Sequence, residues 1–432
     1  MKLGRRALSM GAAAVLFLPL CAQANPLHAH AAPSCAKSVL LNAAGWSGAD
    51  QESKMVTQEI AMFEKANPCI QVFYRPVPSN YQQKVQTEFA SGDEPDVMYV
   101  SPDMIFNEGK AGKLLDLTPY LAKNKVNLKD YIPALLQSFQ LNGKTYGLPK
   151  DFGTLGIFYN KAIFDAKHIP YPSNSLTYDQ YRALALKLYT PSSNPSKVIY
   201  GTMMPEDWGR FNAILYGFGS GIMDPNTGKI LFNNPNAVQA LTYWTDFQLV
   251  DHSATVPGTI GDGWQGDSFG KGRAAMVLEG GWLTPYLRST YPKIRFGVAQ
   301  IPIGPAGRAD PVYTNAWGAS IGTVKAGTAD AAAKLVAFLT GPVVQTYQTD
   351  IGFSLPTLSS LAKLPYLRTH PEDYNLFNSY PSGKPGNYGA FHIQATTAIN
   401  NAITEVILGK QTPTQAIPAA AKTLASQITA VP

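Results

Sequence analysis

The chain has 432 residues, of which 45% are apolar, and a formal net charge of +6. This length and composition predict a folded protein with room for two lobes, each with its own core. Only 15% of the residues are charged, and because no basic run is interleaved with aromatic residues, we expect no nucleic-acid partner. The polar surface must then rely on hydroxyl, amide and tyrosine side chains, which suit a hydroxyl-rich ligand.

Residues 1–24 predict a signal peptide. A basic start precedes an apolar stretch over 7–20, and Ala22-Gln23-Ala24 supplies small residues at the positions that a signal peptidase reads. We expect cleavage after Ala24, with Ala29-His30-Ala31 as an alternative site. The apolar stretch is too short to span a bilayer comfortably. The sequence therefore predicts a secreted protein, in a periplasm or on the extracellular side of the membrane, whose mature chain carries about +3.

The first part of the mature chain alternates strands and helices. Apolar runs predict strands, and apolar residues at helical spacing, such as Val56, Ile60 and Phe63, predict helices. This order indicates a mostly parallel sheet covered on both faces, with ligands bound at the carboxyl ends of the strands. The predicted elements are strands at 39–42, 70–74 and 97–100 and helices at 53–66 and 81–90.

The middle of the chain repeats this α/β pattern less regularly, and its end is helical. Loops rich in Pro, Ser and Asn separate the elements. A second α/β region after the first indicates a second sheet, and therefore a second lobe. The predicted elements are strands at 155–159, 274–278 and 296–300, and helices at 178–188, 238–249, 329–339, 395–408 and 414–428.

Four segments together carry a family resemblance. In their order and spacing they resemble the family-1 extracellular solute-binding proteins of ABC importers, the group of sugar binders that includes maltose-binding protein. The resemblance covers essentially the whole mature chain. The segments are 147–161, with Gly147-Leu148-Pro149-Lys150-Asp151-Phe152; 270–282, with Gly270-Lys271-Gly272-Arg273 and Glu279-Gly280-Gly281-Trp282; 296–318, with Asn315-Ala316-Trp317-Gly318; and 337–356, with Gly352-Phe353-Ser354-Leu355-Pro356.

The resemblance implies an α/β, two-lobed periplasmic-binding-protein fold. Each lobe is then a mostly parallel sheet flanked by helices, and the ligand cleft lies between the lobes. The family pattern assigns 36–150 and 303–341 to the N-terminal lobe, and 151–302 and 342–432 to the C-terminal lobe. The implied function is capture of a sugar or oligosaccharide by a monomer, which closes on it and delivers it to the membrane permease subunits of an ABC importer. On this reading the protein is not an enzyme.

Four tryptophans are candidate ligand contacts, because aromatic rings offer flat apolar faces to the C–H groups of a sugar. Trp46 follows the first strand, where a cleft-facing loop belongs; otherwise it packs on its own lobe. Trp282 matches the place of a sugar-stacking tryptophan in the family. Trp208 lies in a loop before a helix, and Trp317 follows the return to the first lobe. Each of these two either contacts ligand or packs in a core.

Three further candidates lie near expected strand ends and crossings. Asp103 resembles an aspartate that bonds sugar hydroxyls in the family, although a carboxylate there would equally stabilise a helix N-terminus. Asp151 and Phe152 lie where the chain first crosses between lobes. The family often has an acidic ligand contact at the position of Gly153. Its absence puts maltodextrin itself in doubt, and Asp151 is a candidate substitute.

Two other functions stay open. A glycerol-3-phosphate or other phosphate-ester binder of the same fold would use Arg or Lys in the cleft, and Arg210, Arg288 and Arg295 are available. A secreted glycosidase would need two carboxylates flanking the scissile bond, and no local motif marks such a pair, so no catalytic residue is assigned. The six His are dispersed, so we expect no metal site and no cofactor.

Cys35 and Cys69 are expected to form a disulfide. They are the only cysteines left after signal removal, and an exported protein enters an oxidising compartment. Each precedes a predicted strand of one βαβ unit, and parallel strands start at the same edge of a sheet. The bond would close a loop of about 34 residues and stabilise the fold by a few kcal/mol in the chain-entropy model. The alternative is two buried free thiols.

Overall fold

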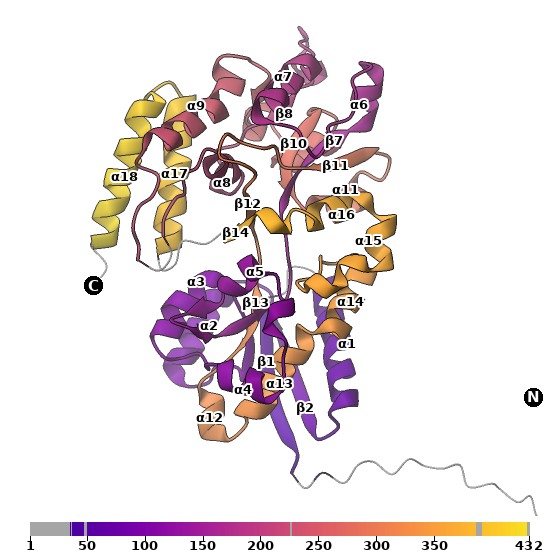
Figure 1. Cartoon of the computed structure of the whole chain (residues 1–432), viewed down its shortest axis with the longest axis vertical. Coiled ribbons are helices and arrows are strands. Elements are labelled where there is room, and N and C mark those ends of the chain that lie inside the picture. Colours follow the sequence, from indigo (N-terminus) through magenta and orange to yellow (C-terminus); the bar gives the residue numbers. More distant parts are fainter. Residues whose placement is uncertain (1–34, 36, 47–49, 225–226, 386–390, 430–432) are drawn as a thin grey trace, which may run out of the picture. The chain divides into compact units, whose positions relative to one another are not determined.

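The computed structural model describes residues 35, 37–46, 50–224, 227–385 and 391–429 (Figure 1). Its largest sheet has the strand order β2-β1-β3-β13-β6. β1 pairs in parallel with β2 and β3, whereas β13 is antiparallel to β3 and to β6. A strand from late in the chain is therefore inserted into a sheet built mainly by the first part. The strands are β1 (Val39–Trp46), β2 (Ile70–Val77), β3 (Val97–Val100), β6 (Gly147–Pro149) and β13 (Ala316–Ala319).

The first hydrophobic core lies between this sheet and its helices. Val56, Ile60 and Phe63 are buried on one face of α1, as their helical spacing predicts. Phe63 meets Phe338 of α13 edge to face, with ring centroids 5.5 Å apart. Apolar residues of β13 join the same core. The helices are α1 (Asp50–Ala66), α2 (Tyr81–Ser91), α3 (Pro102–Met104), α4 (Thr118–Lys123), α5 (Pro133–Gln137), α12 (Gly322–Ala326), α13 (Ala329–Leu339) and α14 (Pro342–Asp350).

The second sheet differs from the prediction in strand direction. Its central strand β7 (Leu155–Asn160) is antiparallel to both neighbours, β10 (Met276–Gly280) and β11 (Phe296–Gln300). The prediction of a mostly parallel sheet is therefore wrong for this lobe. An apolar run indicates burial, but it does not encode the end at which the chain enters the sheet. After β7 the chain passes through a long, mainly helical segment and enters β10 on one side of β7, in the opposite direction. α11 (Leu283–Thr290) then carries the chain to the other side of β7, where it forms β11.

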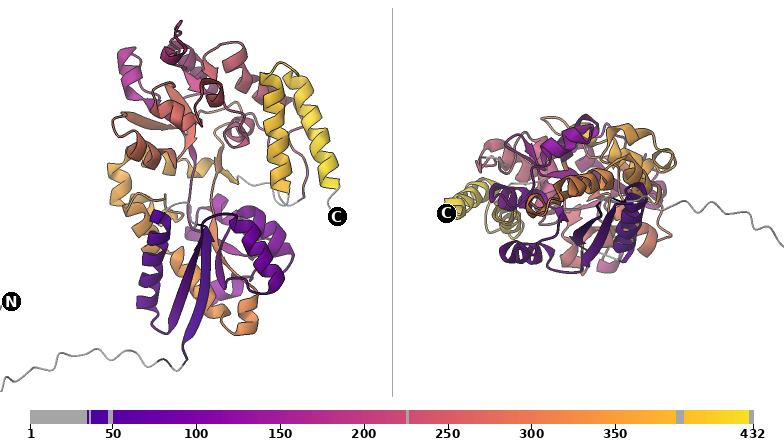
Figure 2. Two further views of the ribbon diagram at one scale, coloured as in Figure 1. Left: turned by 180° about the vertical axis from the view of Figure 1, so that it is seen from behind. Right: turned by 90° about the horizontal axis from the view of Figure 1, so that it is seen from below.

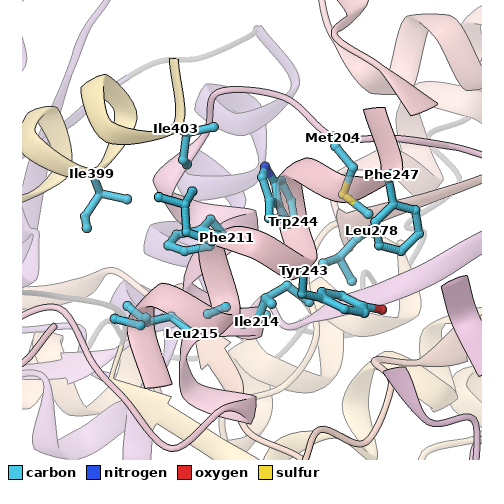
Figure 3. Close-up of a cluster of buried hydrophobic side chains, with 14 of the residues drawn as sticks. Met204, Phe211, Ile214, Leu215, Tyr243, Trp244, Phe247, Leu278, Ile399 and Ile403 are labelled. Atoms are coloured by element: carbon cyan, nitrogen blue, oxygen red, sulfur yellow. The ribbon is translucent and has the colours of Figure 1, made fainter. Parts of the chain in front are cut away.

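A second core packs helices around β7 and β10. Phe211, Trp244 and Phe247 belong to this core together with Ile399 and Ile403 of α17 (Figure 3), and the Phe211 and Trp244 rings meet edge to face with centroids 5.8 Å apart. Figures 1 and 2 show α17 and α18 side by side, and both also contact α9. The helices are α6 (Lys161–Ala166), α7 (Tyr178–Leu188), α8 (Trp208–Gly217), α9 (Pro235–Leu249), α10 (Gln265–Gly270), α17 (His392–Ile407) and α18 (Pro413–Thr429).

A third apolar cluster covers the other face of the second sheet. Phe158 and Val298 of that sheet contact Leu376 and Phe377 of α16 in this cluster. Three short strand pairs complete the fold. The remaining elements are α15 (Pro365–Thr369), α16 (Pro371–Phe377), and the pairs β4 (Gln140–Leu141) with β5 (Lys144–Thr145), β8 (Thr202–Met203) with β9 (Ala254–Thr255), and β12 (Asp310–Val312) with β14 (Gly383–Pro385).

Three segments join the two sets of elements. Linker 1 (150–154) runs from β6 to β7, linker 2 (301–315) runs from β11 to β13, and linker 3 (351–364) runs from α14 to α15. The predicted lobe boundaries at 150/151, 302/303 and 341/342 stay predictions. Three contacts cross these predicted boundaries. Ile303 and β12, both assigned to the N-terminal lobe, pair with Thr177 and β14 of the C-terminal lobe. α14, assigned to the C-terminal lobe, contacts α13 of the N-terminal lobe.

The disulfide prediction is confirmed, because Cys35 and Cys69 are both disulfide-bonded. Val39 pairs directly with Ile70 in the parallel β1–β2 ladder, and the Val39 N–H donates to the Cys69 carbonyl at 2.9 Å. The two strand starts are thus immediate neighbours, as the prediction requires. The predicted signal peptide, residues 1–24, lies outside the described residues. Within the described part of the chain, no helix is both long and apolar enough to cross a membrane.

Candidate functional site

The three linkers meet at a cavity of about 320 Å³. Each linker contributes a wall, and the starts of α11 and α16 close the remaining side. A site built from linkers is one whose shape depends on how those linkers are held. The lining residues are Asp151, Phe152 and Gly153 of linker 1; Tyr313 and Asn315 of linker 2; Gly352, Phe353, Ser354 and Leu355 of linker 3; and Gly281, Trp282, Thr284, Pro285, Tyr366 and Asp373.

Trp282 presents the most exposed aromatic surface of this cavity, with 38% of the residue accessible. Its indole N–H donates to the Glu279 carboxylate at 2.7 Å, and its ring meets Tyr313 edge to face, with centroids 5.4 Å apart. Glu279 is fully buried and also accepts hydrogen bonds from Arg210 and Gln265. The indole is therefore held at one edge while much of its surface stays open to solvent.

Two glycines make room for this ring. A Cβ on Gly280 would lie 2.2 Å from Cη2 of Trp282, which is far inside van der Waals contact. A Cβ on Gly153 would lie 3.4 Å from Cζ3 of the same ring. The Gly280-Gly281 pair noted in the sequence thus lets the indole fold back over its own chain. The glycine at position 153 leaves space that the indole borders.

Asp151 and Phe152, both predicted site residues, line the cavity in different ways. One Asp151 oxygen accepts the Asn315 N–H at 2.6 Å, and the other lies 2.8 Å from Lys150 Nζ. The carboxylate is half-buried and already has two strong partners. Phe152 is 5% exposed and meets Phe377 edge to face, with centroids 6.1 Å apart. It forms part of the cavity floor rather than an open stacking surface.

A second cavity of about 240 Å³ shares Tyr313 and Asn315 with the first. Asp103 and Trp208, both predicted site residues, line it. The Trp208 ring lies 6.3 Å from Tyr313 and 5.0 Å from His392, centroid to centroid. Three aromatic rings, of Trp208, Tyr313 and Trp282, therefore follow one another across the two cavities. The other lining residues are Ser101, Pro102, Val312 and Thr314.

Two charged or titratable groups shape the second cavity. Gln82 donates to Asp103 Oδ2 at 3.1 Å, which leaves the second carboxylate oxygen of Asp103 for other partners. Burial lowers the pKa of His392 below its usual value, against the opposing charge of Asp103. The imidazole is therefore neutral at pH 7 and adds no cationic charge to the cavity wall.

Trp46 and Trp317 lie outside both sets of lining residues. Trp46 ends β1 rather than following it, and it packs on Tyr81 and Tyr99 at 5.3 and 4.7 Å between centroids. Trp317 is fully buried in the middle of β13, with its ring 4.3 Å from that of Tyr99. Both rings belong to the first core, which is the alternative that the sequence left open for each.

Sequence reasoning missed several residues of the first cavity. Tyr313 lies two residues before Asn315, at the edge of a segment that carried the family resemblance, so its position gave a signal. Tyr366 and Asp373 gave none, because they come from separate short helices. The Tyr366 hydroxyl donates to Asp373 at 2.9 Å, and burial raises the pKa of Asp373 against the lowering effect of that hydrogen bond and of Arg288.

Among the residues that the structure describes, those lining the two cavities include three carboxylates and no Lys or Arg. The arginines considered for an anionic ligand are already paired. Arg210 contacts Glu279 and Asp207, and these carboxylates raise its pKa despite the opposing effect of burial. Arg288 contacts Glu372 and lies 3.6 Å from Asp373. Among the described residues, no group of three or more His, Cys, Asp or Glu could hold a metal ion.

Comparison with known proteins finds a family model and relatives of similar sequence. The sequence model of the bacterial extracellular solute-binding proteins matches residues 45–346. A binding protein of Brucella abortus is 25% identical over 249 residues, which are 57% of this chain and 59% of that protein. The arabinooligosaccharide-binding protein of Bacillus subtilis is 27% identical over 201 residues, 46% of this chain and 44% of that protein. The matches thus span about half the length of these curated relatives.

The fold is shared with solved structures of the same kind. An ABC substrate-binding protein of Listeria monocytogenes, in complex with cycloalternan, has a TM-score of 0.77 and 25% identity. The alignment covers 91% of this chain and 100% of that one. These structures are two-lobed periplasmic binding proteins, so the predicted two-lobed α/β fold is confirmed.

Proposed function

This chain belongs to the bacterial extracellular solute-binding protein family, and we propose that it captures a neutral oligosaccharide for an ABC importer. It acts outside the cytoplasmic membrane, holds the sugar at the cavities between its linkers, and delivers it to the membrane permease subunits. Its relatives support this ligand class, since they include an arabinooligosaccharide-binding protein and a substrate-binding protein solved in complex with cycloalternan.

The observation that carries the proposal is the pairing of an open aromatic surface with carboxylates. Trp282 keeps 38% of its surface accessible in a cavity that Asp151 and Asp373 also line. A flat aromatic face attracts the C–H face of a pyranose. Carboxylates accept strong hydrogen bonds from vicinal hydroxyls. The wrong sugar leaves such buried polar groups unpaired, which gives discrimination.

A row of three aromatic rings favours an oligosaccharide over a monosaccharide. Tyr313 is the central ring of the row. The Trp208 ring centroid lies 6.3 Å from it, and the Trp282 ring centroid lies 5.4 Å from it. The two cavities that they border share residues. A ligand of several sugar units can therefore contact an aromatic surface in each cavity at once.

A phosphate ester is not favoured as the ligand. Phosphate recognition uses cations or helix N-termini aimed at the anion. Within the described part of the chain, Asp103, Asp151 and Asp373 line the two cavities and no Lys or Arg does, so a phosphate there would face carboxylates of like charge.

Binding is proposed to occur without turnover. The carboxylates that line the cavities have hydrogen-bond partners that fix them as acceptors: Asp151 holds the Asn315 N–H, and Asp373 holds the Tyr366 hydroxyl. A binder of this family releases its ligand unchanged to the permease. Incubation with the bound sugar should therefore yield no new reducing ends.

A thermal-shift screen tests the proposal. Maltotetraose, an arabinooligosaccharide and cycloalternan should be compared with glycerol 3-phosphate on the mature chain. A ligand that binds only the folded form at 100 times its Kd adds about 2.7 kcal/mol to stability. Trp282→Ala should reduce the shift at the same sugar concentration, whereas Trp46→Phe, a change outside both cavities, should keep it. A shift with glycerol 3-phosphate and with none of the sugars would overturn the neutral-sugar proposal.

A further inference from the structure

Lys150, the first residue of linker 1, is a buried cation that the proposed ligand site does not itself explain. Its side chain is 3% exposed. Nζ lies 2.8 Å from Asp151 Oδ2 and 3.6 Å from Glu52 Oε1 of α1, and 4.3 Å from the centre of the Tyr99 ring. Lysine is almost never fully buried unless it is paired, and here its carboxylate partners raise its pKa against the effect of burial. The Lys150 side chain is therefore held as a buried cation by ion pairs with Asp151 and Glu52.

Asp151 connects this group of ion pairs to the cavity, because its carboxylate both contacts Lys150 and lines the cavity. The carboxylate oxygen that does not contact Lys150 accepts the Asn315 N–H of linker 2. Beside it, Gly153 and Tyr313 exchange backbone hydrogen bonds, each 2.8 Å long, between linkers 1 and 2. Lys150 therefore fixes a carboxylate that lines the cavity and at the same time joins two linkers.

Linker 3 is attached to the same point. Gln345 of α14 donates to the Lys150 carbonyl at 2.9 Å and accepts the Thr357 N–H at 2.7 Å. The Thr357 hydroxyl donates to the Pro149 carbonyl at 3.1 Å. The backbone of Lys150 is thus bonded to Gln345, which also bonds linker 3, and through its N–H to the Asn315 carbonyl of linker 2 at 2.8 Å, while its side chain contacts Asp151 and Glu52.

A second buried carboxylate, Glu59 of α1, borders this cluster. Gln348 donates to Glu59 Oε1 at 2.8 Å, and Ser354 of linker 3 donates to Gln348 at 3.1 Å. Burial raises the pKa of Glu59 from 4.5 to about 7, while the Gln348 hydrogen bond and then the Lys150 charge act to lower it and Glu52 acts to raise it. The titration of Glu59 therefore reports whether the Lys150 charge is in place.

We infer that Lys150 is a positioning residue for ligand capture, which holds the Asp151 carboxylate in the cavity wall and anchors all three linkers to α1 through Glu52. The inference rests on the proposed function, because ligand capture is what the positioned carboxylate serves. It goes further in assigning a role to a residue that the ligand does not contact. Lys150 is absent from the lining of both cavities.

The decisive variant is Lys150→Met, which removes the charge and nearly conserves the shape. Its first readout needs no ligand: hydrogen exchange of the Asn315 amide in the mature chain. We expect exchange at Asn315 to rise at least tenfold, because its acceptor loses its anchor, with no change at the β3 amides. The second readout is the carboxyl 13C titration of Glu59, whose pKa should rise above its wild-type value because a nearby positive charge is gone.

The third readout is affinity for whichever sugar of the thermal-shift panel binds the wild type best. Lys150→Met should lower that affinity at least tenfold. Lys123→Met is the matched control, since Lys123 forms an ion pair with Asp330 with 67% of its side chain exposed, and all three readouts should stay at their wild-type values. If Lys150→Met does not fold, Glu52→Gln replaces it, with smaller changes at Asn315 and in affinity.

The outcomes separate the two proposals. Unchanged exchange at Asn315, or unchanged sugar affinity despite faster exchange, overturns the role of Lys150. If no sugar of the panel binds the wild-type protein, the proposed function fails. In that case the Asn315 exchange and the Glu59 titration still decide whether Lys150 positions Asp151.

Discussion

The buried carboxyl of Glu59 should make the free energy of unfolding depend on pH. The side chain is fully buried on α1. Burial, its largest perturbation, raises the pKa from 4.5 to about 7. Because the folded protein holds this proton more tightly than the unfolded chain, Glu59 contributes stability that is fully present below pH 4.5 and is lost as the pH rises to about 7. The contribution is about 3 kcal/mol, from about 1.4 kcal/mol per pKa unit.

Glu59→Gln removes this dependence, because the amide has the shape of the protonated acid and does not titrate. Urea unfolding of the wild type and the variant, at intervals from pH 4 to pH 7.5, gives a difference curve in which other titrating groups cancel. We expect the wild type to lose stability relative to the variant by about 3 kcal/mol across this range.

A second variant checks the sign of the argument. Gln348 lowers the pKa of folded Glu59 through its hydrogen bond, so Gln348→Leu should extend the upper end of the pH-dependent region to higher pH, while its lower end stays where the unfolded chain titrates. A difference curve that is flat, or that rises with pH, would refute the reasoning. So would a 13C titration of Glu59 with its midpoint near the ordinary value.

Other predictions concern the site and the disulfide. Trp282→Ala should weaken sugar binding by about 1–3 kcal/mol, the range for losing an aromatic anchor, measured by calorimetry; a change below threefold contradicts its stacking role. Trp46→Ala should instead lower the melting temperature of the ligand-free protein and change sugar affinity little, because the Trp46 ring packs on Tyr81 and Tyr99. Gly153→Glu should weaken binding, since a Cβ there already lies 3.4 Å from the Trp282 ring and a longer side chain must displace it; equal or tighter binding refutes this. Cys35→Ser with Cys69→Ser should lower stability by a few kcal/mol without changing affinity, by denaturant titration with and without sugar. Saturating sugar should reduce the radius of gyration in solution scattering, because family members close on their ligand by hinge motion.

Much of the fold could be predicted because burial leaves a periodic trace in the sequence. The predicted strands 97–100 and 296–300 and the predicted helices 178–188 and 329–339 have the bounds that the structure gives them. Where a bound moved, the reason is local. β1 continues to Trp46 because Ala43 and Ala44 are buried within the sheet, and small residues give a weak strand signal.

Strand direction and insertion could not be predicted in the same way. The apolar run at 274–278 reads identically in either direction, yet β10 is antiparallel to β7. β13 lies between β3 and β6, and these strands are far apart in sequence. Such pairings depend on contacts between distant segments. The family resemblance implied the return of the chain to the first lobe, but it did not supply the strand directions of the second sheet.

The candidate site shows the same division between local and distant information. Trp282 was identified because its place matches a sugar-stacking tryptophan of the family, and Gly280 before it leaves the room that the ring needs. Trp317 also lies in a segment of family resemblance, but its burial follows from the insertion of β13, which no local pattern reveals. Local chemistry therefore predicted where a side chain has freedom, whereas topology decided which rings face the cavity.

The role of Lys150 depends on topology most of all. A lysine between proline and aspartate reads as a surface residue, since lysine is mostly exposed. Its burial follows from the convergence of Glu52 from α1, Tyr99 from β3 and Asp151 from the next position of the chain. The same convergence sets the position of Asp151, the candidate substitute for the acidic contact that the family often has at the position of Gly153. One of its oxygens is held by Lys150 and the other by Asn315, while the Trp282 ring borders the space beside Gly153. On the proposed function, sugar recognition would thus rest on the closely set ring of Trp282 and on the Asp151 carboxylate, which Lys150 holds from behind.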